Sequence, residues 1–369
     1  MDEFKRLSKH HSKYMTRHQP SPSKPPLAYC HDAVQDVSRT FALTIDALDP
    51  PLADQICVGY LLCRIPDTIE DSTHISTETQ QRLLRTYYAS LDPESPTSIE
   101  VFTRQARQYI STQSPVADWE LVGNTPTVMA AFEQFSQDTQ EAMRPPIREM
   151  ITGMIRFTGR YADEPGIRIQ TLIELRSYCH YVAGTVGTLI TNLLAKQPLT
   201  TSREEALRRN AEHFGRLLQL VNIAKDVHED YVTENNVYLP SEWLAAEGIP
   251  QDQIIHTDYQ EGAISVLSRV LEQANQHLDA AQSYIEKMPL GNGNTVVAWA
   301  VPYLLAVGTL RELRTNPGTA FAPESVKVSR TEVRTILNAV SATDRQYLTS
   351  LREQVADNPL EELPPRLAP

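Results

Sequence analysis

Apolar residues recur every three or four positions along most of this chain, and this spacing restricts the fold more than any other feature. The segment 262–288 carries a long stripe of this kind, and shorter stripes occupy 36–48 and 172–194. Such spacing is typical of amphipathic helices, whereas a half-buried strand needs strict alternation, which no segment sustains. The sequence therefore predicts an all-α fold, a single-domain helical bundle over residues 28–355.

Breaks in the pattern divide the bundle into expected helices and loops. We predict helices at 36–48, 53–65, 132–160 with an interruption at Pro145 and Pro146, 172–194, 203–231, 262–288, 295–313 and 329–354, and loops at 92–97 and 113–126. The apolar stretch 295–310 contains Pro302 and is short for a bilayer span. We therefore interpret it as a buried core helix.

The charge balance restricts the partners of the protein. Lys and Arg number 34 against 46 Asp and Glu, which gives a formal net charge of −12. Binding to a nucleic-acid backbone needs a cationic face, so we expect no nucleic-acid partner. The cysteines form no C-x-x-C pair, and we interpret them as reduced core thiols of a cytoplasmic protein. They are Cys30, Cys57, Cys63 and Cys179.

The two ends of the chain differ from the bundle in composition. Residues 1–27 are basic and rich in proline and histidine, which favours a disordered arm, and contact with anionic lipid headgroups is the alternative interpretation. Residues 356–369 are expected to form a flexible tail. Neither a secretory leader nor a hydrophobic tail is present in the sequence, so we expect a monomer in the cytoplasm, at most peripheral to a membrane and without a transmembrane segment.

The first acidic motif, DTIED, ends an apolar predicted helix. Asp67 and Asp71 are four residues apart and therefore share a helix face, on which Tyr60 and Arg64 also lie. Two carboxylates held together repel each other, and near a buried surface they need a cation or hydrogen-bond donors. A solvated acidic helix end is the alternative that this motif alone leaves open.

The second acidic motif favours a metal site. Asn222, Asp226 and Asp230 follow Phe214 and Leu218 at intervals of four residues, so one helix face changes from apolar to amide and carboxylate groups. Mg²⁺ prefers oxygen ligands, and substrate phosphates often complete its coordination shell. Two such faces opposite each other would hold a diphosphate through several Mg²⁺ ions.

A third motif, YCHYVAG, places Tyr178 and Val182 on one predicted helix face. Gly184 and Gly187 follow, and each costs about 1 kcal/mol of helix stability relative to alanine. Two interpretations stay open. The glycines either allow two helices to pack closely, or they leave a gap for a prenyl chain with Tyr178 at its polar end.

These motifs together resemble those of a known enzyme family. SRTF (38–41), YLLCRIPDTIED (60–71), YCHYVAG (178–184) and NIAKDVHED (222–230) occur in the order found in the squalene/phytoene synthase family, and DTIED and YCHYVAG are most similar to its squalene-forming members. The resemblance implies an isoprenoid-synthase helical fold with a central apolar cavity. It also implies head-to-head condensation of two farnesyl diphosphates to presqualene diphosphate, followed by reduction with NADPH to squalene.

The resemblance further implies roles for individual residues. Mg²⁺ binding falls to Asp67, Glu70, Asp71, Asn222, Asp226 and Asp230. Tyr178 would assist the first half-reaction as a proton acceptor or by steering the departing diphosphate, and it forms the catalytic set together with Asp67, Asp71, Asp226 and Asp230. Contacts with substrate or cofactor fall to Ser38, Arg39, Phe41, Tyr60, Arg64, Val182, Gln219, Asn222, Lys327 and Arg330.

Several residues depart from the pattern of the family, among them Ser329, which occupies a position that tends to be basic in squalene-forming members, although Arg330 is adjacent. Pro66 deletes a backbone hydrogen bond inside the first acidic helix and is expected to kink it. Lys225 stands where arginine is frequent, and Asn235 and Asn236 stand where an arginine commonly precedes a YLP-like segment. Two alternative functions stay open: a phytoene or dehydrosqualene synthase without the reductive step, and a non-catalytic protein that binds prenyl lipids on the same scaffold.

Overall fold

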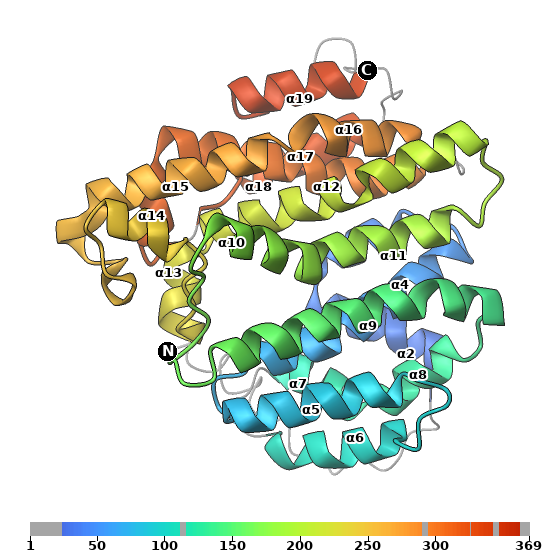
Figure 1. Ribbon diagram of the computed structural model, residues 1–369. Helices are drawn as coiled ribbons and strands as arrows, with labels where there is room; N and C mark the ends of the chain where they lie inside the picture. Colours follow the sequence, from blue (N-terminus) through green and yellow to red (C-terminus); the bar gives the residue numbers. More distant parts are fainter. Residues whose placement is uncertain (1–23, 111–115, 290–293, 325, 342–346, 362–369) are drawn as a thin grey trace, which may run out of the picture.

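The computed structural model describes residues 24–110, 116–289, 294–324, 326–341 and 347–361 as an assembly of helices (Figure 1). The α-helices are α2 (Pro26–Val37), α3 (Arg39–Asp46), α4 (Leu52–Glu70), α5 (Thr77–Ser90), α6 (Ile99–Ala106), α7 (Val116–Gly123), α8 (Thr125–Phe132), α9 (Gln137–Arg160), α10 (Leu172–Cys179), α11 (Thr185–Leu194), α12 (Thr201–Lys225), α13 (Val227–Glu229), α14 (Ser241–Ala246), α15 (Gln260–Asn275), α16 (Leu278–Lys287), α17 (Asn294–Thr315), α18 (Arg330–Ser341) and α19 (Leu348–Asp357). The described residues also form two π-helical turns, η3 (His180–Gly184) and η4 (Asp230–Glu234). They further form short 3₁₀ helices at η2 (Arg107–Tyr109), η5 (Gln251–Gln253), η6 (Thr257–Tyr259) and η7 (Pro317–Phe321). No β-strand occurs in the described ranges, and the predicted all-α class is confirmed.

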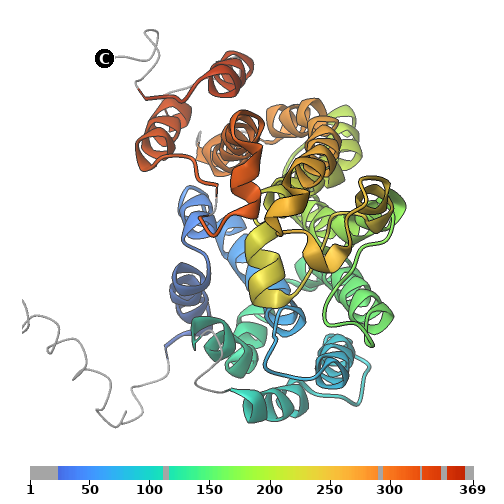
Figure 2. The same cartoon turned by 90° about the vertical axis from the view of Figure 1, so that its left-hand side faces the viewer.

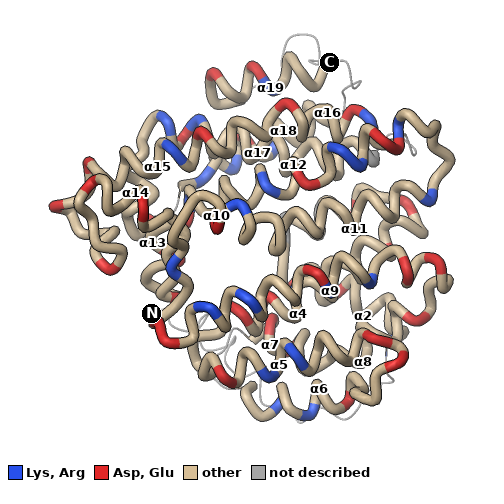
Figure 3. Tube along the Cα trace, viewed as in Figure 1, with Lys and Arg blue, Asp and Glu red and all other residues tan. Residues whose placement is uncertain are grey.

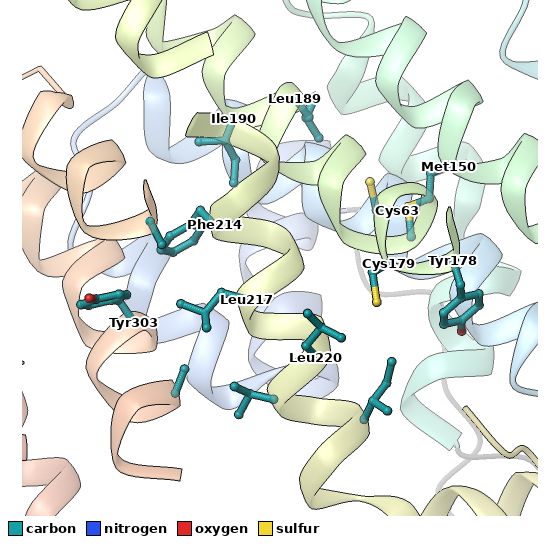
Figure 4. Packing of buried hydrophobic residues seen from close by; sticks show 14 of the residues in the cluster. Cys63, Met150, Tyr178, Cys179, Leu189, Ile190, Phe214, Leu217, Leu220 and Tyr303 are labelled. Carbon is teal, nitrogen blue, oxygen red and sulfur yellow. The ribbon is translucent and has the colours of Figure 1, made fainter. Parts of the chain in front are cut away.

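Helix α12 is the central element of the bundle. It packs against α11 and η3 as well as against α15, α16 and α17, while α9 packs against α4, α5 and α11. Many of these helices are seen end-on in Figure 2. Figure 4 shows Phe214, Leu217 and Leu220 along α12, with Tyr303 on one side and Tyr178 on the other. Helix α12 also carries many charged residues, whereas α11 carries none (Figure 3).

Several predicted boundaries are wrong. The predicted helix 36–48 is broken at Ser38, whose extended backbone ends α2 and whose hydroxyl accepts the Phe41 N–H at 3.3 Å to begin α3. The predicted loop 113–126 contains α7 and the start of α8. The predicted helices 262–288 and 329–354 each divide into two, α15 with α16 and α18 with α19.

Prolines lie inside α4, α9 and α17 without interrupting these helices, and in α4 and α9 the compensating contact can be identified. A proline removes the N–H that would bond to the carbonyl four residues earlier, and here side chains replace that donor. Tyr87 Oη donates to the Leu62 carbonyl, four residues before Pro66, at 2.9 Å. Asn192 Nδ2 donates to the Ala142 carbonyl, four residues before Pro146, at 3.0 Å. Helices α4 and α9 therefore continue through their prolines, and the interruption predicted in 132–160 is wrong.

The predicted core elements are buried. All four cysteines are free and buried. One helix in the described ranges, Val296–Thr315, is long and apolar enough to cross a membrane, but 78% of its apolar window is buried inside the molecule, as the core interpretation predicts. The predicted basic arm falls mainly on residues 1–23, which lie outside the described residues, and α2 already begins at Pro26. Most of the predicted tail, 362–369, also lies outside them.

A π-helical turn joins α10 to α11 where one continuous helix is predicted. The Thr185 N–H bonds to the His180 carbonyl, five residues earlier, which widens the chain by one residue at this turn. The His180 ring lies beside two glutamates of neighbouring helices, with Nδ1 at 3.1 Å from Glu212 and Nε2 at 3.2 Å from Glu149. The turn is thereby connected to α12 and α9.

Glycines bring α11 and η3 close to α12. A Cβ atom at Gly187 would lie 2.2 Å from the Ala211 carbonyl oxygen, and one at Gly215 would lie 2.1 Å from the Ala183 carbonyl oxygen. Because both clashing atoms belong to the backbone, a methyl group at either glycine would require a whole helix to move. The close-packing interpretation of the glycine motif is therefore the one that this geometry supports.

We expect Gly187→Ala to lower the free energy of unfolding by about 1–3 kcal/mol, because α11 and α12 must separate to admit the methyl group. Urea unfolding followed by circular dichroism measures this. Gly159→Ala on α9 is the matched control, since its Cβ meets only the Gln81 side chain, at 3.2 Å, and it is expected to be neutral or stabilising by up to about 1 kcal/mol. Wild-type stability in Gly187→Ala would contradict the close crossing.

Candidate active site

The first acidic motif forms a compact carboxylate cluster at the end of α4. One oxygen each from Asp67, Glu70 and Asp71 lie within 4.8 Å of one another. Glu70 is only 6% exposed, and neither of its buried carboxylate oxygens has a hydrogen-bond partner within the described residues. Burial, and then the charge of Asp67, raise the pKa of Glu70 and of Asp71 well above the usual range. Arg64 beside Asp67 compensates only part of this negative charge, and the oxygen donors of the cluster fit a divalent cation.

Arg64 orients one member of this cluster. Its guanidinium contacts the Asp67 carboxylate and also lies 3.0 Å from Asp118. Tyr60, one turn earlier on α4, stacks on Phe41 of α3 with ring centroids 4.2 Å apart. The predicted contact residues Ser38, Phe41, Tyr60 and Arg64 therefore lie together beside the cluster, whereas the side chain of Arg39 lies outside what the structure describes.

The second acidic motif spans the end of α12, with Asn222 inside the helix, Asp226 at its end and Asp230 beyond it, so the single helix predicted over 203–231 is wrong. The helical angles end at Asp226, but its N–H still bonds to the Asn222 carbonyl at 3.0 Å, and the Asp230 N–H bonds to the Asp226 carbonyl at 2.8 Å. Asp226 and Asp230 therefore stay one turn apart. Lys225 contacts the Asp226 carboxylate. Asn222 is exposed.

The two motifs converge on Glu234, a residue that the sequence analysis missed. Burial raises the pKa of Glu234 to about 7, and the charges of Asp67 and Glu229 add to this. Burial, followed by the charges of Glu234 and Asp226, raises the pKa of Asp230 to about 8. Glu234 thus lies between the clusters. Its position, four residues after Asp230, continues the spacing of the second motif and could have revealed it.

Tyr178 lies next to the first cluster and is nearly inaccessible, with 4% of its surface exposed. Burial, and then the charge of Glu70, raise the pKa of its phenol well above the usual value. Its ring stacks on Tyr238, with centroids 4.8 Å apart, and its Oη lies 3.1 Å from Tyr238 Oη. Tyr238 was also missed, because a tyrosine beside an ordinary loop gives no periodic signal.

Two cavities open beside the converged carboxylates. One, of about 420 Å³, is lined by Glu70, Asp71 and the loop around Gly166, and the other, of about 610 Å³, is lined by Asp226, Asp230 and Lys327. Glu234 belongs to both. The remaining predicted contact residues line neither cavity: Val182 and Gln219 are half-buried, and Arg330 is exposed at the start of α18. The predicted central apolar cavity is neither of these two and stays a prediction.

Comparison with known proteins places these features in a family. Residues 34–332 match the model of the squalene/phytoene synthase family. A Botryococcus squalene synthase from Botryococcus braunii is 28% identical over 330 residues, which are 89% of this chain and 66% of that protein. The squalene synthase of Dictyostelium discoideum is 25% identical over 337 residues, which are 91% of this chain and 76% of that protein. The chain thus spans slightly less than two thirds of the Botryococcus relative.

Solved structures agree in fold. The structure of TcSQS in complex with the ligand BPH1237 has a TM-score of 0.75 and 25% identity, covering 90% of this chain and 92% of that one. A dehydrosqualene synthase in complex with a ligand has a TM-score of 0.60 and 21% identity, covering 88% and 97%, and it shows the fold alone. The match of the family model over most of the sequence shows that the chain belongs to the squalene/phytoene synthase family.

Proposed function

We propose that this protein condenses two molecules of farnesyl diphosphate head to head into presqualene diphosphate and then reduces that intermediate with NADPH to squalene. The observation that carries the proposal is the buried, unpartnered Glu70 carboxylate, which lies in a three-carboxylate cluster beside Tyr178. Such a cluster costs stability unless cations occupy it, so its presence fits a site for a metal-bound diphosphate. Family membership supports the same reaction class.

The residues that would hold Mg²⁺ are the carboxylates of both motifs, Asp67, Glu70, Asp71, Asp226 and Asp230, with Asn222 as a further oxygen donor. When bound, Mg²⁺ supplies positive charge that stabilises the departing diphosphate more than the bound ester. Arg64 holds Asp67 in place for this role. Glu234, which lies between the two motifs, would provide a further oxygen ligand.

Apolar and aromatic residues would protect the allylic cation that remains. The stacked Phe41 and Tyr60 rings lie next to Arg64, where a prenyl chain would leave its diphosphate. An aromatic face stabilises a nearby cation by about 0.5–2 kcal/mol. Burial of the Tyr178 phenol keeps it protonated, and its proton is donated to Tyr238 Oη at 3.1 Å, so Tyr178 would steer the departing diphosphate through that second hydroxyl.

For the reductive step, Lys327 and Arg330 would contact the phosphates of NADPH. Both side chains are exposed, neither forms a salt bridge within the described ranges, and Lys327 lines the 610 Å³ cavity together with Asp226. When bound, NADPH supplies the hydride. Cations without a protein partner beside a cavity fit a polyanionic cofactor.

The proposal predicts that purified protein converts farnesyl diphosphate to squalene only when both Mg²⁺ and NADPH are present. Without NADPH, we expect presqualene diphosphate or dehydrosqualene-type hydrocarbons, identified by mass spectrometry. A parallel incubation with geranylgeranyl diphosphate separates the alternatives. A C40 product alone would favour a phytoene synthase, and prenyl-lipid binding without turnover would favour a non-catalytic protein.

A further inference from the structure

Tyr178 and Tyr238 form a buried pair of phenols whose hydrogen bonds can be counted. Their exposed fractions are 4% and 6%, and Tyr178 Oη donates to Tyr238 Oη at 3.1 Å. Phe157 packs its edge against Tyr178, with ring centroids 5.1 Å apart, so this ring cannot turn away. Both phenols are therefore shielded from bulk solvent, and each hydroxyl proton needs an acceptor inside the protein.

Asn236 contacts this pair through a side-chain amide whose orientation is determined by its neighbours. The Ile167 backbone N–H donates to Asn236 Oδ1 at 2.8 Å, so the other amide atom must be the nitrogen. Asn236 Nδ2 donates to Tyr238 Oη at 3.1 Å and to Glu234 Oε2 at 3.1 Å. Both amide protons and the carbonyl oxygen are thus used, and Asn236 is only 7% exposed.

The backbone around Asn236 is also held in place. The Val237 N–H bonds to the Ile167 carbonyl at 2.8 Å, and the Ile169 N–H bonds to the Val237 carbonyl at 3.1 Å. This bridge ties the segment that follows the second acidic motif to the loop that precedes α10. The position of Asn236 relative to Tyr238 therefore does not depend on a mobile loop.

The hydrogen bonds of the Tyr238 hydroxyl leave its own proton available to a ligand. Its oxygen has two acceptor positions, and Tyr178 and Asn236 occupy both. The Tyr238 O–H proton has no acceptor within the described residues. The carboxylates of Glu70, Asp71, Asp230 and Glu234 lie close enough for their charges, after burial, to raise the pKa of this phenol. The Asn236 amide nitrogen joins Tyr238 Oη to Glu234 Oε2, at 3.1 Å each, and Asn236 and Glu234 both line the 420 Å³ cavity. The Tyr238 hydroxyl therefore lies directly behind the wall of the cavity in which the diphosphate is proposed to bind.

We propose that Asn236 is a positioning residue, which together with Tyr178 directs the free O–H of Tyr238 at the departing diphosphate. This inference rests on the proposed function. A hydrogen bond to an oxygen that gains negative charge strengthens in the transition state, so its loss lowers kcat more than it raises KM. No proton is transferred in this role. Asn236 itself lines the 420 Å³ cavity, and in this role it acts through Tyr238.

Tyr238→Phe is expected to lower kcat about 10²-fold with little change in KM, which is the usual effect of removing one donor to a developing anion. Asn236→Asp is the sharper variant. Its carboxylate still accepts from the Ile167 N–H but now also accepts the Tyr238 proton, which turns that O–H away from the diphosphate. We expect a loss of kcat similar to that of Tyr238→Phe. The double variant should be no slower than Tyr238→Phe alone, because both changes remove one interaction.

Asn192→Asp is the matched control. Asn192 also joins three helices, through Ala142 O and Arg208 at 3.0 Å each, but it lies outside the site. We expect it to lower the melting temperature with kcat unchanged. Wild-type kcat in Asn236→Asp, or losses that multiply in the double variant, would overturn the positioning role.

Binding of inorganic diphosphate in the presence of Mg²⁺, measured by calorimetry, gives a readout that does not need turnover. We expect about tenfold weaker binding in Tyr238→Phe and in Asn236→Asp, with thermal melts to show that both fold. If the wild-type protein binds diphosphate and the variants bind it less well, but no hydrocarbon forms, only the proposed reaction fails. If the variants bind diphosphate like the wild-type protein, the positioning role fails.

Discussion

Replacing Asp67 or Asp226 by asparagine is expected to abolish hydrocarbon formation while the helical fold stays intact. Each carboxylate belongs to a different acidic motif, and in the proposed function both motifs hold the diphosphate through Mg²⁺. Asparagine keeps the shape of the side chain but loses the charge that attracts a divalent cation. We expect turnover of farnesyl diphosphate to fall by at least about 10²-fold in each variant.

Stability should change little in these variants, because each substitution removes one charge from a cluster of like charges. Arg64 keeps a partner in Asp118, at 3.0 Å, when Asp67 is neutralised. Asp258→Asn, whose side chain is 79% exposed, is the control and should retain full turnover. Circular dichroism and product analysis decide the matter, and near-normal turnover in either site variant would refute the assignment of both motifs to one metal centre.

The second large effect concerns pH. Without Mg²⁺, the folded protein is expected to lose about 1–3 kcal/mol of stability as the pH rises from about 6.5 to 8.5. Asp230, with a pKa near 8, and Glu234, near 7, stay protonated in the folded state at a pH where the unfolded chain has already released these protons. Glu70 and Asp71 add to the effect. The folded state therefore binds more protons, and its stability falls as they are removed.

The pH range matters because two neighbouring histidines act in the opposite direction. Burial, followed by the charge of Arg216, lowers the pKa of His213. Burial, followed by the charge of His213, lowers the pKa of His277 to about 4, so this residue makes stability rise between about pH 4 and 6.5. Above that range the carboxyl groups act alone. Saturating Mg²⁺ should restore stability at pH 8.5, and Glu70→Gln should reduce the pH dependence of the metal-free protein. Stability that stays constant from pH 6.5 to 8.5 without Mg²⁺ would contradict the buried carboxylate cluster.

The sequence predicts those parts of the site that repeat at helical spacing. Asp67 and Asp71 share a face of α4, and Asp226 and Asp230 stay one turn apart, because local hydrogen bonds maintain an interval of four residues even past the end of α12. Spacing along one segment says nothing about contacts between segments. For this reason Tyr238, and its partner Asn236 held by Ile167, could not be found from the sequence.

Helix boundaries show the same limit. The prolines of α4 and α9 are read from sequence as breaks, but Tyr87 and Asn192 supply the lost donors from other helices. Local propensity is overridden wherever tertiary contacts satisfy the backbone. The fold class, in contrast, follows directly from the apolar periodicity, since long amphipathic segments leave few ways to bury their apolar faces.

The π-helical turn at 180–184 restricts which insertions and deletions the chain can accept. The extra residue rotates everything after it by roughly 100° relative to a regular helix. Upstream of the turn, Tyr178 lies beside the carboxylates, and downstream Gly187 lies against the Ala211 backbone. Deleting a single residue here would restore a regular α-helix. Either Tyr178 would then turn away from the carboxylates or Gly187 would turn away from α12. The π-helical turn thus sets the rotation between the two parts of the segment, so that Tyr178 faces the carboxylates while Gly187 faces α12. Insertions or deletions at this turn should therefore be tolerated far less well than substitutions.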